Sequence, residues 1–284
     1  MAAKYRLGNL DLAIISDGAF YMDAGAVFGI VPRIMWQPYA GPLDDRHRMA
    51  LGLNSLLLRS QGHLILIETG IGDKGNARRQ ASPASEGTLL DGLASLGIRP
   101  EEIDVVINTH LHADHCGWNT RYAGDEIVPT FANAGYHVSR DEWQAAIQPN
   151  ERTRATYLAE NFLPLEERGR LRLFDGETRV TDEVTIVPTP GHSAGHASVV
   201  LASGGETAIY IGDVSQTAVQ LERTAWVSAF DILPLVSMET KRHLVEGAIR
   251  DGSVIVSAHA PFPGLGRMTR TSEGHRRWTA LPVD

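Results

Sequence analysis

Residues 110–115 read His-Leu-His-Ala-Asp-His and place four potential metal ligands within six positions. Imidazole and carboxylate groups suit zinc and similar divalent cations. With the His and Asp frequencies of this chain, the pattern should arise by chance in roughly one chain in a thousand. The preceding residues 103–108 are rich in β-branched side chains and are typical of a buried strand. The motif therefore begins where a predicted strand ends, and a short loop there can direct its side chains to one point.

Three more candidate ligands follow strand-like runs farther along the chain. His192 follows the apolar run 184–187, Asp213 follows the run 208–211, and His259 follows the run 254–256. Each of them precedes a predicted turn. Four strand ends that converge on one edge of a sheet would bring seven ligands together. We therefore expect a metal centre at that edge.

A structural role for these residues is the competing interpretation. Three imidazoles and a carboxylate would then crowd together without a ligand, which is unfavourable for buried polar groups. A single structural zinc ion is a further alternative, but such sites usually use cysteine and need four ligands rather than seven. The pattern favours a catalytic centre.

The motifs together resemble those of the metallo-β-lactamase-fold hydrolases, over about residues 10–268. The resemblance rests on the His-x-His-x-Asp-His run and on the Gly-His, Gly-Asp and Ala-His pairs that contain the three later ligands. Ile-Glu-Thr-Gly at 67–70 resembles an early family motif that more often reads Asp-Thr-Gly.

Other motifs of the sequence resemble two particular branches of this family. Gly-His-Ser-Ala-Gly-His at 191–196 resembles the lactonase and thioesterase branches. Ser-Asp-Gly at 16–18, Ala-Val-Gln-Leu at 218–221 and the run 258–264 resemble the branch that contains methyl parathion hydrolase. Acyl-homoserine lactonases carry a tyrosine three residues beyond the bridging aspartate, where this chain has Gln216.

The resemblance divides the seven ligands between two divalent metal ions, with zinc as the first choice and manganese, iron or cobalt as alternatives. One ion would bind His110, His112 and His192, the other would bind Asp114, His115 and His259, and Asp213 would bridge the two. Two such cations can hold a hydroxide between them near neutral pH. The expected catalytic residues are Asp213 and Asp114, the latter as a proton carrier for the leaving group. Glu68 and His196 are expected to orient the ligands through outer hydrogen bonds.

These features predict a dinuclear metal-dependent hydrolase that uses a metal-bridging hydroxide to open a small neutral lactone or cleave an ester. A phosphotriesterase like methyl parathion hydrolase is the alternative, because one hydroxide can attack either centre. A β-lactamase is less favoured, because the zinc β-lactamases that use a cysteine ligand carry it where this chain has Asp213. A non-catalytic metal-binding protein is a fourth interpretation, which the complete ligand set disfavours.

The flanking sequence predicts a mixed α and β chain. Residues 4–16 and 51–67 predict antiparallel strands, the latter with a turn at Gln61-Gly62. Helices are predicted over 86–96, after a capping box at Ser139, and over 239–250. The resemblance implies an α+β fold, the αββα sandwich, with two mixed β-sheets and helices on the outer faces. Residues 1–284 are expected to form a single domain.

Residues 18–50 show no strong periodicity and are rich in aromatic side chains, which predicts a substrate-covering loop or a homodimer interface. The candidate substrate pocket is expected to use aromatic residues from this segment and from three others. They are Phe20, Phe28, Trp36, Trp118, Phe230 and Phe262.

The composition and net charge limit which classes of partner we expect. A net charge of −8 gives no electrostatic footprint for nucleic acid. No apolar run approaches the roughly 18 residues that span a bilayer, and the N-terminus has no apolar signal core, so we expect a cytoplasmic location and a small-molecule substrate. The single cysteine, Cys116, excludes an intramolecular disulfide.

Overall fold

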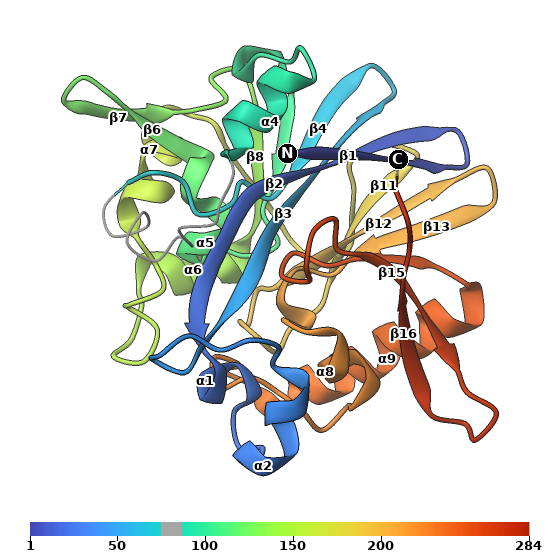
Figure 1. Cartoon of the computed structure of the whole chain (residues 1–284). Coiled ribbons are helices and arrows are strands. Elements are labelled where there is room, and N and C mark those ends of the chain that lie inside the picture. The colour runs from blue at the N-terminus through green and yellow to red at the C-terminus, as the bar shows by residue number, and fades with distance from the viewer. Residues whose placement is uncertain (75–86, 284) are drawn as a thin grey trace.

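The computed structural model describes residues 1–74 and 87–283 and contains two seven-stranded sheets (Figure 1). The first sheet has the order β1 (Ala2–Leu7), β2 (Leu10–Asp23), β3 (Arg48–Ser60), β4 (His63–Ile67), β5 (Val105–Ile107), β8 (Gly135–Ser139) and β9 (Leu171–Phe174). The second has the order β10 (Thr178–Arg179), β11 (Val184–Pro188), β12 (Ala197–Ser203), β13 (Glu206–Tyr210), β14 (Val254–Val256), β15 (Leu265–Arg270) and β16 (Arg276–Ala280). A separate hairpin pairs β6 (Thr120–Ala123) with β7 (Glu126–Pro129).

The two sheets pack face to face because their strands are apolar on both sides. In β3, Leu56 belongs to the apolar cluster between the sheets, and Leu57 belongs to the cluster on the outer side. In β14, Val254 faces the other sheet and Ile255 faces outward. Successive side chains of a strand point to opposite faces, so each sheet needs a second covering layer.

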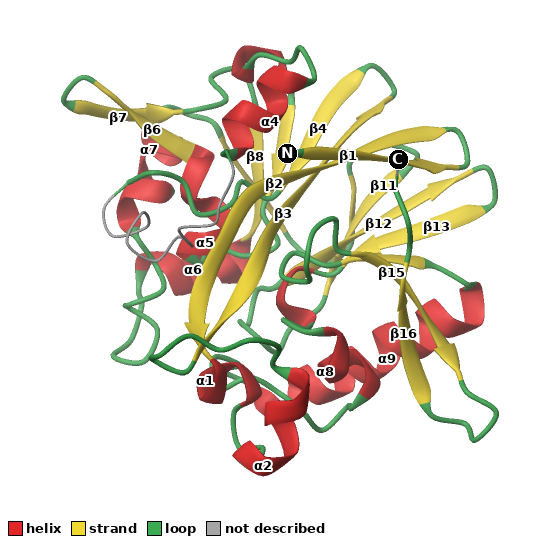
Figure 2. Cartoon of the chain, in the orientation of Figure 1, coloured by secondary structure: helices red, strands yellow, loops and turns green. Residues whose placement is uncertain are grey.

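Helices supply these outer layers (Figure 2). Leu93 of one helix and Trp143 of another pack into the outer cluster of the first sheet, and Val245 packs into that of the second. The α-helices are α1 (Ala24–Phe28), α2 (Arg33–Trp36), α4 (Leu89–Ser95), α5 (Ala113–Cys116), α6 (Arg140–Ile147), α7 (Leu163–Glu167), α8 (Ala218–Glu222) and α9 (Pro234–Asp251). The 3-10 helices are η1 (Gln37–Tyr39), η2 (Pro100–Glu102), η3 (Gly117–Asn119), η4 (Ala159–Asn161) and η5 (Gly212–Val214). The αββα sandwich with two mixed sheets is confirmed.

Several predicted boundaries are reproduced closely. The turn between β3 and β4 places Gln61 and Gly62 at φ 49° and 86°, as a tight hairpin turn requires. Helix α4 begins at Leu89, and residue 86 of the predicted range lies outside the described residues. Helix α9 begins earlier than predicted, at Pro234, whose missing N–H is harmless in a first turn. It ends before Gly252, which has φ 62°.

The expectation of one irregular segment over 18–50 is corrected. β2 continues to Asp23 and β3 begins at Arg48, so strands enclose the short helices α1 and α2. Ile30, between the two helices, is 92% exposed, and Ile34, within α2, is 86% exposed. The homodimer through this segment stays a prediction, and it now depends on these exposed aliphatic side chains.

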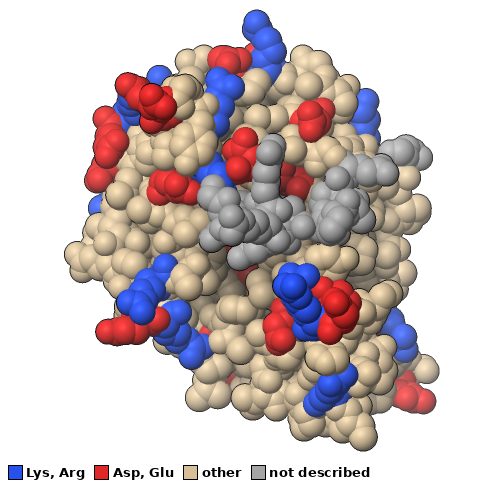
Figure 3. Space-filling view, turned by 60° about the vertical axis from the view of Figure 1, so that its left-hand side comes forward, with Lys and Arg blue, Asp and Glu red and all other residues tan. Residues whose placement is uncertain are grey.

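The surface carries charges of both signs. Figure 3 shows, on one face, lysine and arginine side chains interspersed with aspartate and glutamate among uncharged residues. Within the described residues, no helix has the length and apolar character needed to cross a membrane.

Candidate metal centre

The seven candidate ligands lie beyond the carboxyl ends of strands from both sheets. The motif at 110–115 follows β5, which runs parallel to β4 in the first sheet. Asp213 and His259 follow β13 and β14, which are parallel neighbours in the second sheet. His192 lies in the connection between β11 and β12. The face-to-face packing of the sheets brings the four segments together.

The ligand atoms gather in two groups without shared members, and a third set, His110, His115 and Asp213, connects them. His110, His112 and His192 each place one ring nitrogen within 4.8 Å of the others, and His192 Nε2 lies 3.0 Å from His112 Nδ1. A second group consists of Asp114, His115 and His259. In the second group, the two imidazole Nε2 atoms are 3.1 Å apart, and each lies 3.5 Å from Asp114 Oδ2.

The carboxylate of Asp213 lies between the two groups. Its Oδ2 is 3.2 Å from His192 Nε2 in the first group. Its Oδ1 is 2.9 Å from His259 Nε2 and 3.2 Å from His115 Nε2 in the second. One oxygen therefore faces each group, which is the arrangement needed for a bridging ligand.

Two buried atoms of the cluster fit metal binding better than hydrogen bonding. His110 Nε2 is buried and has no hydrogen-bond partner among the described residues, and the same holds for Asp213 Oδ1 despite its short distances to imidazole nitrogens. Buried polar atoms are nearly always paired in proteins. A cation beside these atoms would satisfy both, so the donor set fits a group of divalent ions.

The ring orientation of His192 is set by an aspartate that we did not predict. Asp231 Oδ1 lies 3.0 Å from His192 Nδ1 and leaves Nε2 to face the cluster, while Asp231 Oδ2 accepts a hydrogen bond from Ser237 Oγ at 2.6 Å. Asp231 follows η5 and α8 by several residues and belongs to no motif, so its sequence context carries no signal. Outer carboxylates of this kind orient metal-binding histidines.

Glu68 lies where an orienting residue was expected. It follows β4, and its Oε2 is 2.7 Å from His115 Nδ1, while its Oε1 accepts a hydrogen bond from the backbone N–H of Thr109. Gly52 O, 2.8 Å away, is the outer partner of His259 Nδ1. The second group is thus oriented by one carboxylate and one backbone carbonyl.

His196 forms a hydrogen bond with Asp213 rather than with either group of candidate ligands. Its Nε2 accepts a hydrogen bond from the backbone N–H of Asp213 at 3.0 Å, and its Nδ1 lies 3.0 Å from Thr189 O. Burial lowers the pKa of His196 to about 3, so the ring is neutral and can accept. The preceding Gly212 has φ 49°, and a Cβ there would lie 2.7 Å from His196 Nε2.

Glu142 links the two loops that carry the first group. Ser139 caps α6 as predicted, but the Glu142 side chain does not return to it. Instead its Oε1 accepts hydrogen bonds from Leu111 N and Tyr157 Oη, both at 2.9 Å, and its Oε2 accepts one from Ser193 Oγ at 2.5 Å. Burial raises the pKa of Glu142. The sequence signal for a helix cap concealed this role.

The pKa values of the five candidate ligand histidines are shifted in two different directions. Burial lowers the pKa of His110 and His112 well below the ordinary value, so both are neutral and able to bind metal. Burial opposes protonation of the other three rings too, but the nearby carboxylates together outweigh it and raise their pKa, with Asp114 acting most on His115 and Asp213 acting most on the other two. These rings are His115, His192 and His259. Those same imidazoles hold the pKa of Asp213 well below its usual range, although burial alone would raise it.

A cavity of about 50 Å³ opens onto the cluster. Its lining includes Phe20 and Phe230, two of the six expected pocket residues, together with Gln216. It is lined by Phe20, Met22, Val27, Leu51, His112, Asp114, Thr156, His192, Asp213, Gln216, Phe230 and His259.

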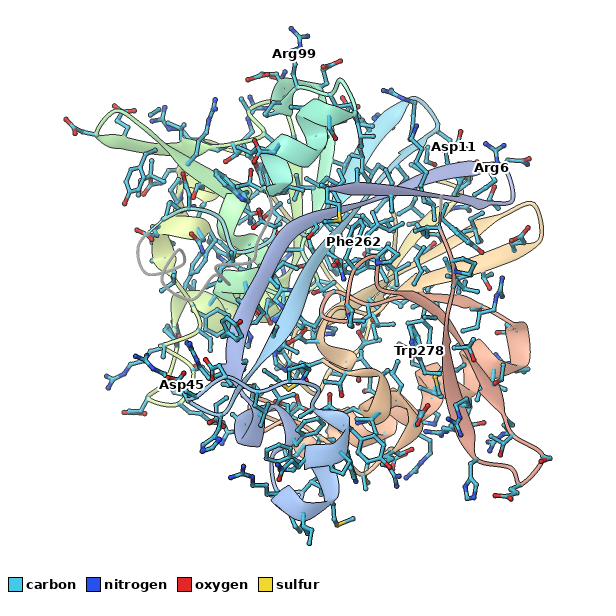
Figure 4. The ribbon with its side chains drawn as sticks, viewed as in Figure 1. Arg6, Asp11, Asp45, Arg99, Phe262 and Trp278 are labelled. Atoms are coloured by element: carbon cyan, nitrogen blue, oxygen red, sulfur yellow. The ribbon has the colours of Figure 1, made fainter. Side chains whose placement is uncertain are left out.

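The other four expected pocket residues lie elsewhere. Phe28 stacks on Trp36 with ring centroids 5.2 Å apart, in a buried cluster beside the cavity. Trp118 is buried in the outer cluster of the first sheet and donates through Nε1 to Asp17 Oδ1 at 2.8 Å. Phe262, which Figure 4 labels, packs against the apolar cluster between the sheets. Their aromatic rings serve packing, which composition alone does not distinguish from a pocket.

Metal-dependent hydrolases are the class of protein that this fold and this cluster define. A model of the metallo-beta-lactamase superfamily matches residues 49–259, and the chain belongs to that superfamily. The N-acyl homoserine lactonase AiiA of Bacillus thuringiensis subsp. kurstaki is 26% identical over 175 residues, which cover 61% of this chain and 62% of that relative. The chain thus matches less than two thirds of the length of this relative.

Solved structures agree with this assignment. A probable metal-dependent hydrolase from Staphylococcus aureus is 26% identical with a TM-score of 0.87, and the match covers 98% of this chain and 99% of that one. AidC, a dizinc quorum-quenching lactonase solved with N-hexanoyl-L-homoserine, is 20% identical with a TM-score of 0.83, covering 99% and 97% of the two chains. The latter likeness supports the fold.

Proposed function

We propose that this protein is a dinuclear metal-dependent hydrolase that opens small neutral lactones or cleaves related esters. The observation that carries the proposal is the position of the Asp213 carboxylate, with one oxygen toward His192 and the other toward His115 and His259. The likeness to proteins named N-acyl homoserine lactonases supports the choice of substrate class.

Two divalent ions, zinc in our proposal, would be held by the two groups and by Asp213 between them. When bound, such ions supply an activated water and polarise the substrate carbonyl. The protein contributes the placement of the ligand atoms, which the outer partners Asp231 and Glu68 fix.

The cavity lining supports a neutral substrate. Its walls are formed in part by Phe20, Met22, Val27, Leu51 and Phe230, and no lysine or arginine is among the described residues that line it. A substrate with a negative charge would find no cationic side chain there. An uncharged ring with an alkyl substituent can bury apolar surface against these walls.

Asp114 is the proposed proton carrier. It lines the cavity, and its side chain is 21% exposed, unlike those of the buried histidines around it. A carboxylate at the cavity wall can take the proton from the hydroxyl group that has added to the carbonyl carbon and pass it to the alkoxide that leaves when the ring opens.

The test compares metal-replete wild type with Asp213→Asn. We measure kcat/KM on an aliphatic γ- or δ-lactone, on an activated phosphotriester and on a chromogenic β-lactam, with the bound metal counted in each preparation. We expect the lactone to be preferred, and Asp213→Asn to lose at least about a hundredfold. Asp45→Asn, on the exposed surface, is the control.

Unchanged lactone hydrolysis in Asp213→Asn would overturn the bridged arrangement. A preference of wild type for the phosphotriester would replace the substrate class, since one nucleophile can serve a carbonyl or a phosphoryl centre. Faster cleavage of the β-lactam would replace it likewise.

A further inference from the structure

Gln216 is a buried amide held rigidly at the wall of the cavity. The residue is 4% exposed and lines the cavity beside Asp213. Its backbone N–H donates to Gln220 Oε1 at 3.1 Å, and Gln220 Nε2 donates to Val27 O at 2.8 Å. These bonds tie the segment between β13 and α8 to helix α1, so the position of Gln216 is fixed before any substrate binds.

The orientation of this amide follows from its partner. Gln216 Nε2 donates to Asp213 Oδ2 at 3.1 Å. A carboxylate accepts hydrogen bonds and cannot donate one, so the nitrogen and not the oxygen must face Asp213. The oxygen Oε1 lies on the other branch of the planar amide, and it accepts no hydrogen bond from any residue within 1–74 or 87–283.

We propose that Gln216 determines substrate specificity by offering its amide oxygen to a hydrogen-bond donor that the substrate carries next to the scissile carbonyl. The proposal rests on the proposed lactonase or esterase function and specifies the substrate class. A substrate with an N–H or O–H group on the carbon beside the carbonyl satisfies this acceptor, whereas a substrate without it covers the oxygen and leaves it unpaired.

A second polar residue of the cavity provides the competing explanation. Apart from the candidate metal ligands, the polar residues that line the cavity are Thr156 and Gln216. Thr156 Oγ1 donates to Thr153 O at 2.8 Å, so its hydroxyl could also accept a bond from a substrate. A test must therefore separate these two acceptors.

The experiment uses two pairs of γ-butyrolactones that differ by one donor. In the first pair the α-substituent is an acylamino group or its N-methyl counterpart, and in the second it is a hydroxyl or a methoxy group. The ratio of kcat/KM within each pair is measured for metal-replete wild type, Gln216→Met and Thr156→Val. We expect wild type to prefer the donor in both pairs by about tenfold, and Gln216→Met to bring both ratios near one.

The ratio separates specificity from damage to the site. Gln216→Met also removes the donor to Asp213, which slows both members of a pair alike and cancels in the ratio. Gln216→Leu is a second apolar variant if the methionine variant folds poorly. Thr156→Val should keep both wild-type ratios.

Several outcomes would overturn the proposal. These are an absence of preference in wild type, a preference in either pair that survives in Gln216→Met and Gln216→Leu, or a preference lost in Thr156→Val. A metal-replete wild type that hydrolyses none of the four lactones would instead refute the proposed function itself.

Discussion

At the scale of single residues, the outer partners of the histidines decide which ring nitrogen faces the cluster. The backbone carbonyl of Gly52 takes this role for His259, and the carboxylates of Asp231 and Glu68 take it for His192 and His115 respectively. The candidate ligands could be singled out from the sequence because their types and spacing are unusual. Gly52 and Asp231 could not, because a backbone carbonyl has no sequence signature and Asp231 approaches from a distant segment.

Removing the Asp231 carboxylate should weaken metal binding in the group that contains His192. In Asp231→Asn the imidazole Nδ1–H loses its charged acceptor, so the ring is less basic and less well oriented. We expect the affinity for the metal bound by that group to fall about 10- to 100-fold. Competition with a chromophoric chelator measures it.

Asp45→Asn is the matched control, because Asp45 lies on the exposed surface, where Figure 4 labels it. It should bind metal as wild type does. An Asp231→Asn protein with unchanged affinity would show that His192 needs no outer carboxylate.

At the scale of elements, the sequence predicted what local patterns determine. The hairpin at Gln61, helix α4 and the end of α9 at Gly252 each rest on a few consecutive residues. The Glu142 side chain could not be predicted, because its partners Leu111 and Ser193 come from other parts of the chain. Tertiary contacts overrode a local capping signal there.

Asp17 is another tertiary link that the sequence concealed. It lies in the irregular part of β2, and its carboxylate accepts hydrogen bonds from Ile71 N, Leu89 N and Trp118 Nε1 at 2.7 to 2.9 Å. Burial outweighs these bonds and raises the pKa of Asp17 to about 6. The strand, the loop after β4 and the start of α4 therefore meet at one titratable group.

Stability should consequently depend on pH through Asp17. The folded state binds this proton more tightly than the unfolded chain, whose ordinary pKa is 3.8. The contribution is fully present below that value and is lost as the pH rises through about 6. We expect the free energy of unfolding of wild type, relative to Asp17→Asn, to fall by about 2 kcal/mol between pH 4.5 and pH 7.5.

Urea unfolding of the metal-free proteins at both pH values measures this difference. Asp11→Asn, at an exposed position near the start of β2 (Figure 4), should show no such change relative to wild type. A constant difference between wild type and Asp17→Asn would mean that the hydrogen bonds, and not burial, set the ionisation of Asp17.

At the scale of the whole molecule, the candidate metal centre joins the two halves of the sandwich. His110, His112 and His115 follow a strand of the first sheet, whereas Asp213 and His259 follow strands of the second. The sandwich itself followed from the family resemblance, since periodicity predicted only a mixed chain. The small cavity could not be predicted, because it depends on which aromatic rings pack against α1 and α2 and which ones are left to line the cavity.

Metal removal should therefore destabilise the whole fold rather than a single loop. The ligands converge only in the folded state, so bound metal stabilises it by about 2.7 kcal/mol when the free metal concentration is a hundred times the Kd. For a chain of this size we expect the Tm to fall by about 5 °C after treatment with a chelator and to recover when metal is restored.

His259→Ala, which removes a candidate ligand that follows a strand of the second sheet, should show a smaller chelator-induced shift. His275→Ala, on the exposed turn before β16, should show the full shift. Equal Tm values for the metal-free and metal-replete wild type would show that the two sheets hold together without the ions.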